Sequence, residues 1–314
     1  MIGDLLKQLP IALVRYVRYH GARLFGSRST GDPGDQVFDA HAGLPKAGLD
    51  ESYLEATAWP TYRGNSAPQD LRSDPLYELW SKTLGGQKWS HYFSIYRELF
   101  GHLTGSPQRV LEIGVYRGAS LELWRQYFSH PETVIVGIDI EPSCAQFDSP
   151  KDGKRVRVGS QSDQAFLRAV VEEFGPFDLI IDDGSHRSAD VIASFNGLFS
   201  SGLKDSGIYF VEDLHAAYWP DWRDSQDSFL DLCKELVEHM HALYQRASPV
   251  DIFVASPPDH PLAAFEVPRV ATMIREIRFF DSIVAIYKTR RENAPFTIRM
   301  DYPRSADWVM GRTT

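Results

Sequence analysis

Apolar segments of strand-like length alternate with helix-like segments along the middle of this chain, and this alternation restricts the possible folds more than any other feature. The strand-like segments are residues 109–114, 133–139, 155–159, 177–182 and 207–213. The intervening segments, such as ASLELWRQYF and DQAFLRAVVEEF, have apolar residues at helical spacing. Strands that are apolar on both faces are expected inside a parallel sheet with helices on each side. The sequence therefore predicts an α/β fold with a Rossmann-like, doubly wound sheet that is mostly parallel.

Two segments outside this alternation predict the borders of the sheet. Residues 273–288, MIREIRFFDSIVAIYK, have the pattern of two strands joined by a tight turn at Asp281 and Ser282. We expect an antiparallel hairpin at the edge of the sheet. Residues 88–103, before the first strand, have apolar side chains at helical spacing, which predicts a helix.

Composition suggests three regions. We expect an N-terminal region of helices and linker at 1–85, the α/β domain at 86–290 and a C-terminal tail at 291–314. The N-terminal region is predicted to begin with an amphipathic helix whose apolar face contains Leu13, Val14, Val17 and Leu24. We expect this helix to form a homo-oligomer by packing on a partner subunit, while packing on its own domain and lying on a membrane are the alternatives. The region could equally cover the substrate.

Charge and cysteine content disfavour several classes of protein. The 33 Lys and Arg against 42 Asp and Glu give a net charge of −9, which disfavours a nucleic-acid partner. Two cysteines without a CxxC pair exclude a zinc ribbon or a disulfide framework and favour a reducing compartment. The apolar stretch at 11–14 is too short to cross a membrane, and no signal-peptide pattern follows it. We therefore expect a cytoplasmic protein without a transmembrane segment.

The first two predicted strands end in residues that suit an adenosine-type ligand. The first runs into an ExGxxxGxS pattern made by Glu112, Gly114, Gly118 and Ser120. Glycines at these positions let the backbone turn tightly and approach a ligand closely. Asp139 ends the second strand, where a carboxylate can accept both hydroxyls of a ribose. Each signal alone is weak, since an acid at a strand end can simply cap a helix. Together they favour adenosine binding.

The fourth and fifth predicted strands end in a concentration of acidic residues. IDDGSH contains Asp182, Asp183 and His186, and VED contains Glu212 and Asp213. Uncompensated carboxylates at adjacent strand ends would repel one another and raise their own pKa values. A hard divalent cation such as Mg²⁺ would compensate them, and a histidine beside it suits general-base catalysis. The alternative is a polar turn in which the acids cap helices.

These motifs resemble a known family over about residues 86–288. VLEIGVYRGAS followed by GIDI is similar to the cofactor loop and ribose-binding acid of class I S-adenosylmethionine-dependent methyltransferases. FDLIIDDGSH together with VEDLHAAYWP resembles the metal-dependent sugar O-methyltransferases of macrolide-antibiotic tailoring. The resemblance implies S-adenosylmethionine and Mg²⁺ as cofactors and a small-molecule glycoside as the substrate.

The resemblance also implies roles for individual residues. The residues implied to bind the cofactor are Glu112, Gly114, Gly118, Ser120, Asp139, Gln161, Asp163 and Asp182. Among them, Glu112 and Gly114 would flank the methionine part, so that a valine at 114 is expected to block the cofactor without disturbing the fold. The implied Mg²⁺ ligands are Asp183, Glu212 and Asp213, with His186 as the base. Lys88, His91 and Tyr92 would face the cofactor or the substrate.

The predicted reaction is methyl transfer from S-adenosylmethionine to a hydroxyl of a vicinal diol on a sugar. A catechol would satisfy the same chelation, and a non-catalytic nucleotide-binding or assembly protein is the alternative from another class. An NAD-dependent oxidoreductase is disfavoured because the GxGxxG pattern is absent from the first strand and its loop. Trp219 and Trp222 would either form an apolar wall for a sugar ring or pack in the core.

Overall fold

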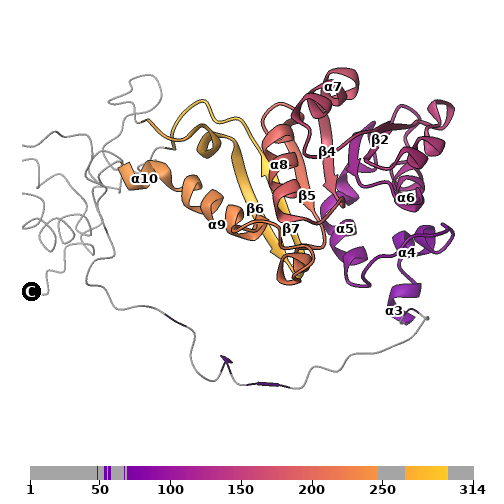
Figure 1. Ribbon diagram of the computed structural model, residues 1–314, viewed down its shortest axis with the longest axis horizontal. Helices are drawn as coiled ribbons and strands as arrows, with labels where there is room; N and C mark the ends of the chain where they lie inside the picture. The colour runs from indigo at the N-terminus through magenta and orange to yellow at the C-terminus, as the bar shows by residue number, and fades with distance from the viewer. Residues whose placement is uncertain are drawn as a thin grey trace, which may run out of the picture. The chain divides into compact units, whose positions relative to one another are not determined.

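The computed structural model describes residues 48, 53–54, 56–57, 67, 69–246 and 266–295. Within these ranges the strands form one seven-stranded mixed sheet with the order β3-β2-β1-β4-β5-β7-β6 (Figure 1). The strands are β1 Arg109–Ile113, β2 Val134–Asp139, β3 Lys154–Val158, β4 Phe177–Asp182, β5 Leu203–Val211, β6 Ile274–Phe280 and β7 Ile283–Lys288. Strands β1 to β5 pair in parallel, and β7 is antiparallel to both β5 and β6. The predicted Rossmann-like fold is confirmed.

Helices cover both faces of this sheet. The α-helices are α3 Gln69–Arg72, α4 Pro75–Trp80, α5 Tyr92–Phe100, α6 Ala119–Tyr127, α7 Gln164–Phe174, α8 Ser188–Leu198, α9 Phe229–Met240 and α10 Ala242–Arg246. The 3₁₀ helices are η3 Gly101–Leu103, η4 Pro142–Phe147, η5 Pro150–Asp152, η6 Leu214–Tyr218 and η7 Arg269–Thr272. In Figure 1, α8 and α9 run in front of the strands.

Successive strand residues belong to two different hydrophobic cores, as the two-residue period of a strand requires. On β1, Val110 packs in the core formed with α4, α5 and α6, whereas Leu111 packs in the core formed with α7, α8 and α9. On β5, Phe210 and Val211 divide in the same way. Burial on both faces explains why these strands read as continuous apolar runs.

The C-terminal hairpin has the predicted form. Strands β6 and β7 pair antiparallel around a turn at Asp281 and Ser282, and Ser282 has a φ of 64°. The strand that joins the parallel part is β7, which pairs with β5, so that β6 forms the edge of the sheet. The prediction of an antiparallel edge hairpin is confirmed.

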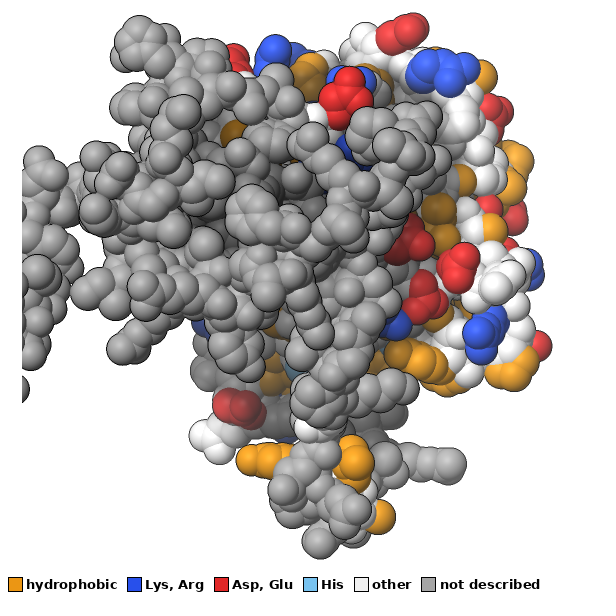
Figure 2. Space-filling model, turned by 90° about the vertical axis from the view of Figure 1, so that its left-hand side faces the viewer, with side chains coloured by type: hydrophobic (Ala, Val, Ile, Leu, Met, Phe, Trp, Pro, Cys, Tyr) orange, Lys and Arg blue, Asp and Glu red, His pale blue; other side chains and the backbone are white. Residues whose placement is uncertain are grey.

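The predicted N-terminal region, residues 1–85, lies only partly within the described residues. Helix α4 contributes the fully buried Leu76 to the core that contains α5 and α6. The predicted amphipathic helix near the N-terminus and the oligomer contact assigned to it lie outside the described residues. Among the helices that are described, none combines the length and the apolar character needed to cross a bilayer. On the coloured part of the face in Figure 2, Lys and Arg side chains are mixed with Asp and Glu.

Candidate active site

A cavity of about 850 Å³ lies at the carboxyl ends of the parallel strands. Its lining includes a residue at or after the end of every parallel strand: Gly114 for β1, Asp139 for β2, Gly159 for β3, Asp183 for β4 and Asp213 for β5. Strand β1 lies between β2 and β4, so the strand order reverses there, and open α/β sheets bind their ligands at this point. The volume suits a small-molecule site.

The loop after β1 depends on two glycines with a left-handed backbone. Gly114 has a φ of +95°, and a Cβ at this position would lie 2.1 Å from the backbone oxygen of Asp183. Gly118 has a φ of +75°, and its Cβ would lie 2.6 Å from the ring of Phe147. The expectation that a valine at 114 would leave the fold intact is therefore wrong, because the side chain would collide with the backbone that follows β4.

Asp139 ties this loop to the end of β2. Its Oδ2 accepts hydrogen bonds from the backbone amides of Val115 at 2.8 Å and Tyr116 at 2.9 Å, and its Oδ1 accepts from the amide of Glu141 at 2.9 Å. Burial alone would raise the pKa of Asp139, but these amides outweigh burial and lower it. An ionised carboxylate thus lines the cavity next to the loop after β1.

Glu112, predicted to contact a cofactor, points away from the cavity. It is fully buried on the α6 side of the sheet, where its Oε1 accepts a hydrogen bond from the indole nitrogen of Trp124 at 2.9 Å. Its Oε2 finds no hydrogen-bond partner in the described part of the chain. Burial raises the pKa of Glu112 to about 7. Gly118 and Ser120, which begin α6, are likewise not among the described residues that line the cavity.

Gln161 and Asp182 form a network under the loop that follows β4. Gln161 lines the cavity, donates a hydrogen bond of 3.2 Å to Oδ1 of Asp182 and accepts one of 2.8 Å from the backbone amide of Ser185. Asp182 is buried beneath it and also accepts a hydrogen bond from the hydroxyl of Ser194. Burial raises the pKa of Asp182 to about 6. These two residues position the loop that carries Asp183.

Asp163, which the resemblance implies to bind the cofactor, caps a helix in the structure. Its Oδ1 accepts hydrogen bonds from the backbone amides of Ala165 at 2.8 Å and Phe166 at 3.2 Å. Asp163 therefore caps the N-terminus of α7. The first amides of a helix have no partner within the helix, and the Asp163 side chain provides one for these two. Asp163 is not among the described residues that line the cavity, so its contact with the cofactor stays a prediction.

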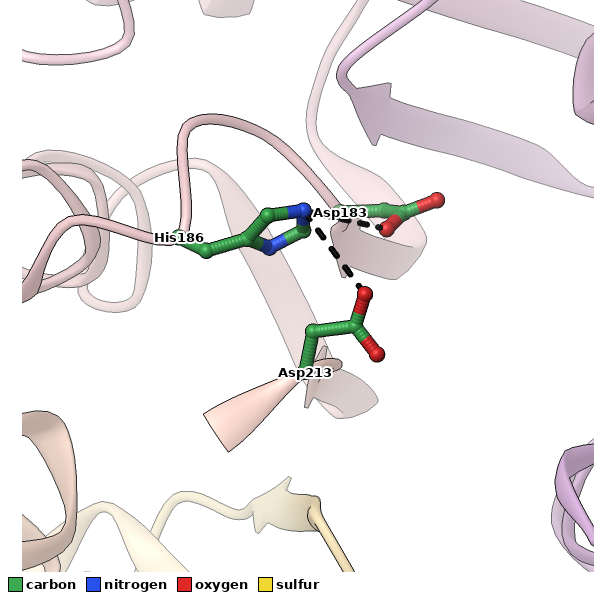
Figure 3. Close-up of side chains that lie close together, drawn as sticks. All are labelled: Asp183, His186 and Asp213. Atoms are coloured by element: carbon green, nitrogen blue, oxygen red, sulfur yellow. Dashed lines mark ion pairs between the residues drawn. The ribbon is translucent and has the colours of Figure 1, made fainter. Parts of the chain in front are cut away.

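Asp183, His186 and Asp213 converge within the cavity (Figure 3). One ligand atom from each lies within 4.8 Å of the others. Nε2 of His186 is 3.7 Å from Oδ2 of Asp213 and 4.0 Å from Oδ1 of Asp183. His186 and Asp213 have φ values of 57° and 53°, a backbone region that is strained for residues other than glycine and is often found at functional sites. Two carboxylates are suitable ligands for a hard divalent cation, and an imidazole beside them is suitable as a general base.

Glu212, the third predicted metal ligand, lies outside this cluster. It is buried, with its Oε2 2.6 Å from Nζ of Lys88 and its Oε1 2.8 Å from the hydroxyl of Tyr96. Lys88 also donates a hydrogen bond to Asp183. Burial alone would lower the pKa of Lys88, but the two carboxylates outweigh burial and raise it, so the ammonium stays charged. The two acids at 212 and 213 therefore face different surroundings.

Helix α5 begins at Tyr92, four residues later than the predicted helix, and it reaches the site together with the loop before it, although not with all three of the suggested residues. Lys88 and Tyr92 line the cavity, and the Tyr92 hydroxyl donates a hydrogen bond of 2.6 Å to Oδ1 of Asp213. His91 is not among the described lining residues, and its Nε2 is 3.2 Å from the backbone oxygen of Asp281.

Two lining residues, His215 and Trp89, were not singled out from the sequence. Nδ1 of His215 is 2.5 Å from the hydroxyl of Ser282 in the hairpin turn. That contact joins residues 67 positions apart, so no local pattern could have predicted it. Trp89 follows the buried Lys88 and reaches the cavity through the loop between α4 and α5.

Comparison with curated proteins finds O-methyltransferases that are similar to this chain, although no protein-family model matches it. The 8-demethyl-8-(2-methoxy-alpha-L-rhamnosyl)-tetracenomycin-C 3'-O-methyltransferase of Streptomyces olivaceus is 34% identical over 211 residues, covering 61% of this chain and 50% of the relative. The L-olivosyl-oleandolide 3-O-methyltransferase of Streptomyces antibioticus is 38% identical over 196 residues, covering 56% and 47%. The chain spans about half the length of the curated relatives it matches.

Comparison with solved structures also finds a methyltransferase. The MycE methyltransferase of the mycinamycin biosynthetic pathway, in complex with Mg, SAH and mycinamycin VI, is 27% identical with a TM-score of 0.54. That match covers 72% of this chain and 57% of MycE. The first crystal form of MycE with Mg and SAH gives 28% identity and a TM-score of 0.56, covering 76% and 59%.

Proposed function

We propose that this chain, which is related to the class I S-adenosylmethionine-dependent O-methyltransferases that act on sugars of macrolides and polyketides, methylates a sugar hydroxyl of a natural-product glycoside. The reaction would depend on Mg²⁺. One observation carries the proposal: a single cavity joins the glycine loop and Asp139 to Asp183, His186 and Asp213. A methyl donor and a metal-assisted acceptor can therefore occupy adjacent parts of one space.

The β1–β2 side of the cavity fits S-adenosylmethionine. Asp139 lines this side as an ionised carboxylate and can accept hydrogen bonds from ribose hydroxyls. Ile140, the next residue, is 66% exposed and lines the same side, which gives an apolar surface suitable for an adenine ring. At Gly114 the backbone of the loop lies close to the backbone of Asp183. This side of the cavity is therefore next to Asp183, His186 and Asp213, which we call the acidic cluster.

The β4–β5 side fits a magnesium ion. Asp183 and Asp213 provide the carboxylate oxygens that Mg²⁺ prefers, and both would be its ligands. Glu212, the third predicted ligand, would have to leave its ion pair with Lys88 to join them. When bound, Mg²⁺ would orient the acceptor oxygens and make the reacting hydroxyl more acidic.

The protein residues then have separate roles in the transfer. His186 accepts the proton of the acceptor hydroxyl, and Asp213, with an oxygen 3.7 Å from its Nε2, stabilises the imidazolium that results. Tyr92 holds the other oxygen of Asp213 through its hydroxyl. The acceptor oxygen forms a bond to the methyl carbon as the bond from that carbon to sulfur breaks. The products are a methyl ether, S-adenosylhomocysteine and a proton on His186.

The test begins with calorimetry of S-adenosylhomocysteine binding, with and without Mg²⁺. The second step uses methyl-labelled S-adenosylmethionine with a rhamnosyl glycoside, a catechol and no acceptor. Label in the rhamnosyl product, lost in EDTA and restored by Mg²⁺, supports the proposal. Labelling of the catechol alone would move the activity to the catechol class. Cofactor binding without label in any acceptor would favour a non-catalytic nucleotide-binding protein.

The cellular setting and domain roles form part of the same proposal. Both cysteines, Cys144 and Cys233, are free thiols in the structure, which supports a reducing, cytoplasmic location. We propose that residues 1–85 serve oligomerisation or cover the substrate, with 86–290 as the methyltransferase domain and 291–314 as a tail. Sedimentation of the full chain and of a variant lacking residues 1–25 would test the oligomer, since a monomeric full chain would contradict it.

A further inference from the structure

Four aromatic side chains line the cavity beside the acidic cluster: Trp89, His215, Trp219 and Trp222. We call these four residues the aromatic wall. The ring centroids of Trp89 and His215 are 5.3 Å apart, those of His215 and Trp219 are 4.7 Å apart, and those of Trp219 and Trp222 are 5.6 Å apart. All three pairs meet edge to face, so the rings form one continuous surface although they come from two segments of the chain.

Two indoles of the aromatic wall, those of Trp89 and Trp219, are too exposed to serve the core. Trp89 is 50% exposed and Trp219 is 46% exposed, whereas the tryptophan at 124 is fully buried. Leaving apolar ring surface in water forgoes the hydrophobic free energy that a contact would provide. For Trp219, this exposure favours the sugar-wall alternative over core packing. We infer that the aromatic wall stacks against the pyranose ring that carries the hydroxyl to be methylated, an inference that rests on the proposed function.

The wall is held in place before any ligand arrives. Nδ1 of His215 contacts the Ser282 hydroxyl at 2.5 Å, and the backbone amide of Leu214 donates a hydrogen bond of 3.0 Å to the backbone oxygen of Ser282. The amide of Trp222 donates a hydrogen bond of 3.1 Å to the oxygen of Trp219. A surface fixed by such contacts loses little conformational entropy on binding.

The aromatic wall lies next to the acidic cluster, so we expect the sugar, and not the rest of the glycoside, to stack on it. Nδ1 of His215 is 4.0 Å from Oδ1 of Asp213. Trp89 directly follows Lys88, whose ammonium donates a hydrogen bond to Asp183. A ring stacked at this end of the wall thus lies beside the acidic cluster, where the reacting hydroxyl must be.

The chemistry of an aromatic face also suits a pyranose. The face of an indole carries partial negative charge, and the C–H bonds on one side of a pyranose carry partial positive charge. A 6-deoxyhexose lacks one hydroxyl and presents more C–H surface than a hexose. The ligand class that the wall fits is therefore a pyranoside, and a 6-deoxypyranoside better than its hydroxylated counterpart.

Saturation-transfer NMR with 4-nitrophenyl α-L-rhamnopyranoside tests this inference on the full chain with S-adenosylhomocysteine and Mg²⁺. We expect the strongest saturation on the sugar C–H protons. Trp219→Leu and Trp89→Leu should each weaken rhamnoside binding about tenfold or more, while leaving S-adenosylhomocysteine binding unchanged. Tyr218→Ala is the matched control, because Tyr218 is 76% exposed next to Trp219 but is not among the described lining residues. Its rhamnoside affinity should equal that of the wild type.

The outcomes separate this inference from the proposed function. A wild-type chain that does not bind S-adenosylhomocysteine contradicts the proposed function itself. If the cofactor product binds, the inference is overturned by wild-type rhamnoside affinity in both tryptophan variants or by the absence of saturation on the sugar. Strongest saturation on the nitrophenyl protons also overturns it, because the wall would then bind the aglycone.

Discussion

The ammonium of Lys88 lies 2.6 Å from Oε2 of Glu212, and both side chains are buried, with Lys88 only 4% exposed. The same ammonium donates a hydrogen bond to Asp183, so one residue from the loop before α5 joins the ends of β4 and β5. Removing one partner of a buried ion pair leaves an uncompensated charge, which typically costs about 3–5 kcal/mol. Lys88 therefore balances acidic residues that would otherwise repel one another next to the proposed metal site.

Lys88→Met should lower the free energy of unfolding in EDTA by about 3–5 kcal/mol. Mg²⁺ should recover part of this loss, because it can compensate the carboxylates that Lys88 no longer neutralises. Chemical denaturation in EDTA and in Mg²⁺ measures both effects. The double variant Lys88→Met with Glu212→Gln removes both charges of the pair and should be more stable than the single variant. A single variant with wild-type stability would contradict the role of Lys88.

Asp183→Asn and His186→Ala should respond differently to Mg²⁺. Asp183→Asn weakens the proposed metal site, so raising the Mg²⁺ concentration should recover part of its activity. His186→Ala removes the proton acceptor and should lower kcat by about 10²–10⁴-fold, a defect that persists at saturating Mg²⁺. This defect should shrink as pH rises, because the acceptor hydroxyl then ionises with less help. Rates measured against Mg²⁺ at two pH values distinguish the roles, and recovery of His186→Ala by Mg²⁺ would make His186 a metal-binding residue.

Glu112→Gln should change how stability depends on pH. Burial raises the pKa of Glu112 from 4.5 to about 7, so the folded protein keeps a proton that the unfolded chain has already lost. The stability that this proton provides is complete below about pH 4.5 and is lost as pH rises to about 7. Glutamine cannot ionise but keeps an oxygen that can accept the hydrogen bond from Trp124. Relative to the wild type, the variant should therefore gain about 3 kcal/mol in free energy of unfolding between pH 4 and pH 8.

Denaturation curves across this pH range provide the measurement for Glu112. Glu122→Gln is a control of opposite sign, because hydrogen bonds from Lys154 and Gln126 lower the pKa of the Glu122 carboxyl. That variant should lose stability relative to the wild type as pH rises. If Glu112→Gln and the wild type show parallel pH curves, Glu112 does not hold a proton in the folded state.

Gly114→Ala should destabilise the fold as well as the cofactor side of the cavity. The new Cβ would lie 2.1 Å from the Asp183 backbone oxygen in a left-handed conformation, and such strain typically costs about 1–3 kcal/mol before any collision is counted. Gly105→Ala is the matched control, since a Cβ there meets nothing within 4 Å. Thermal unfolding of both variants is the measurement. A Gly114→Ala protein as stable as the control would show that the loop can move away from β4.

The fold could be predicted from sequence because its strands are buried on both faces. Val110 and Leu111 are both fully buried, on opposite sides of the sheet, and such strands leave a continuous apolar signal. In the site, only the residues placed by the ends of the parallel strands could be predicted from the sequence. Asp139, Asp183 and Asp213 lie in the cavity because the parallel strands deliver their carboxyl ends to one edge of the sheet.

Glu112 and Glu212 lie where the two-residue period of a strand places them. Phe210 belongs to the core on the α5 side and Val211 to the opposite core, so Glu212 returns to the α5 side, where Lys88 and Tyr96 meet it. Glu112 follows Leu111 in the same way and meets Trp124. The partner of Glu212 could not be predicted, because Lys88 is 124 residues away along the chain.

Strand β7 is the last described strand along the chain, yet it lies between β5 and β6 in the sheet. All the described residues that line the cavity precede it, and the turn before it contributes the Ser282 contact to His215. During synthesis, the described lining residues would therefore leave the ribosome before β7, the described strand that pairs with the outer backbone edge of β5. The order of synthesis and the order of assembly differ, and the part of the cavity next to Asp213 would be completed only after β7 had emerged.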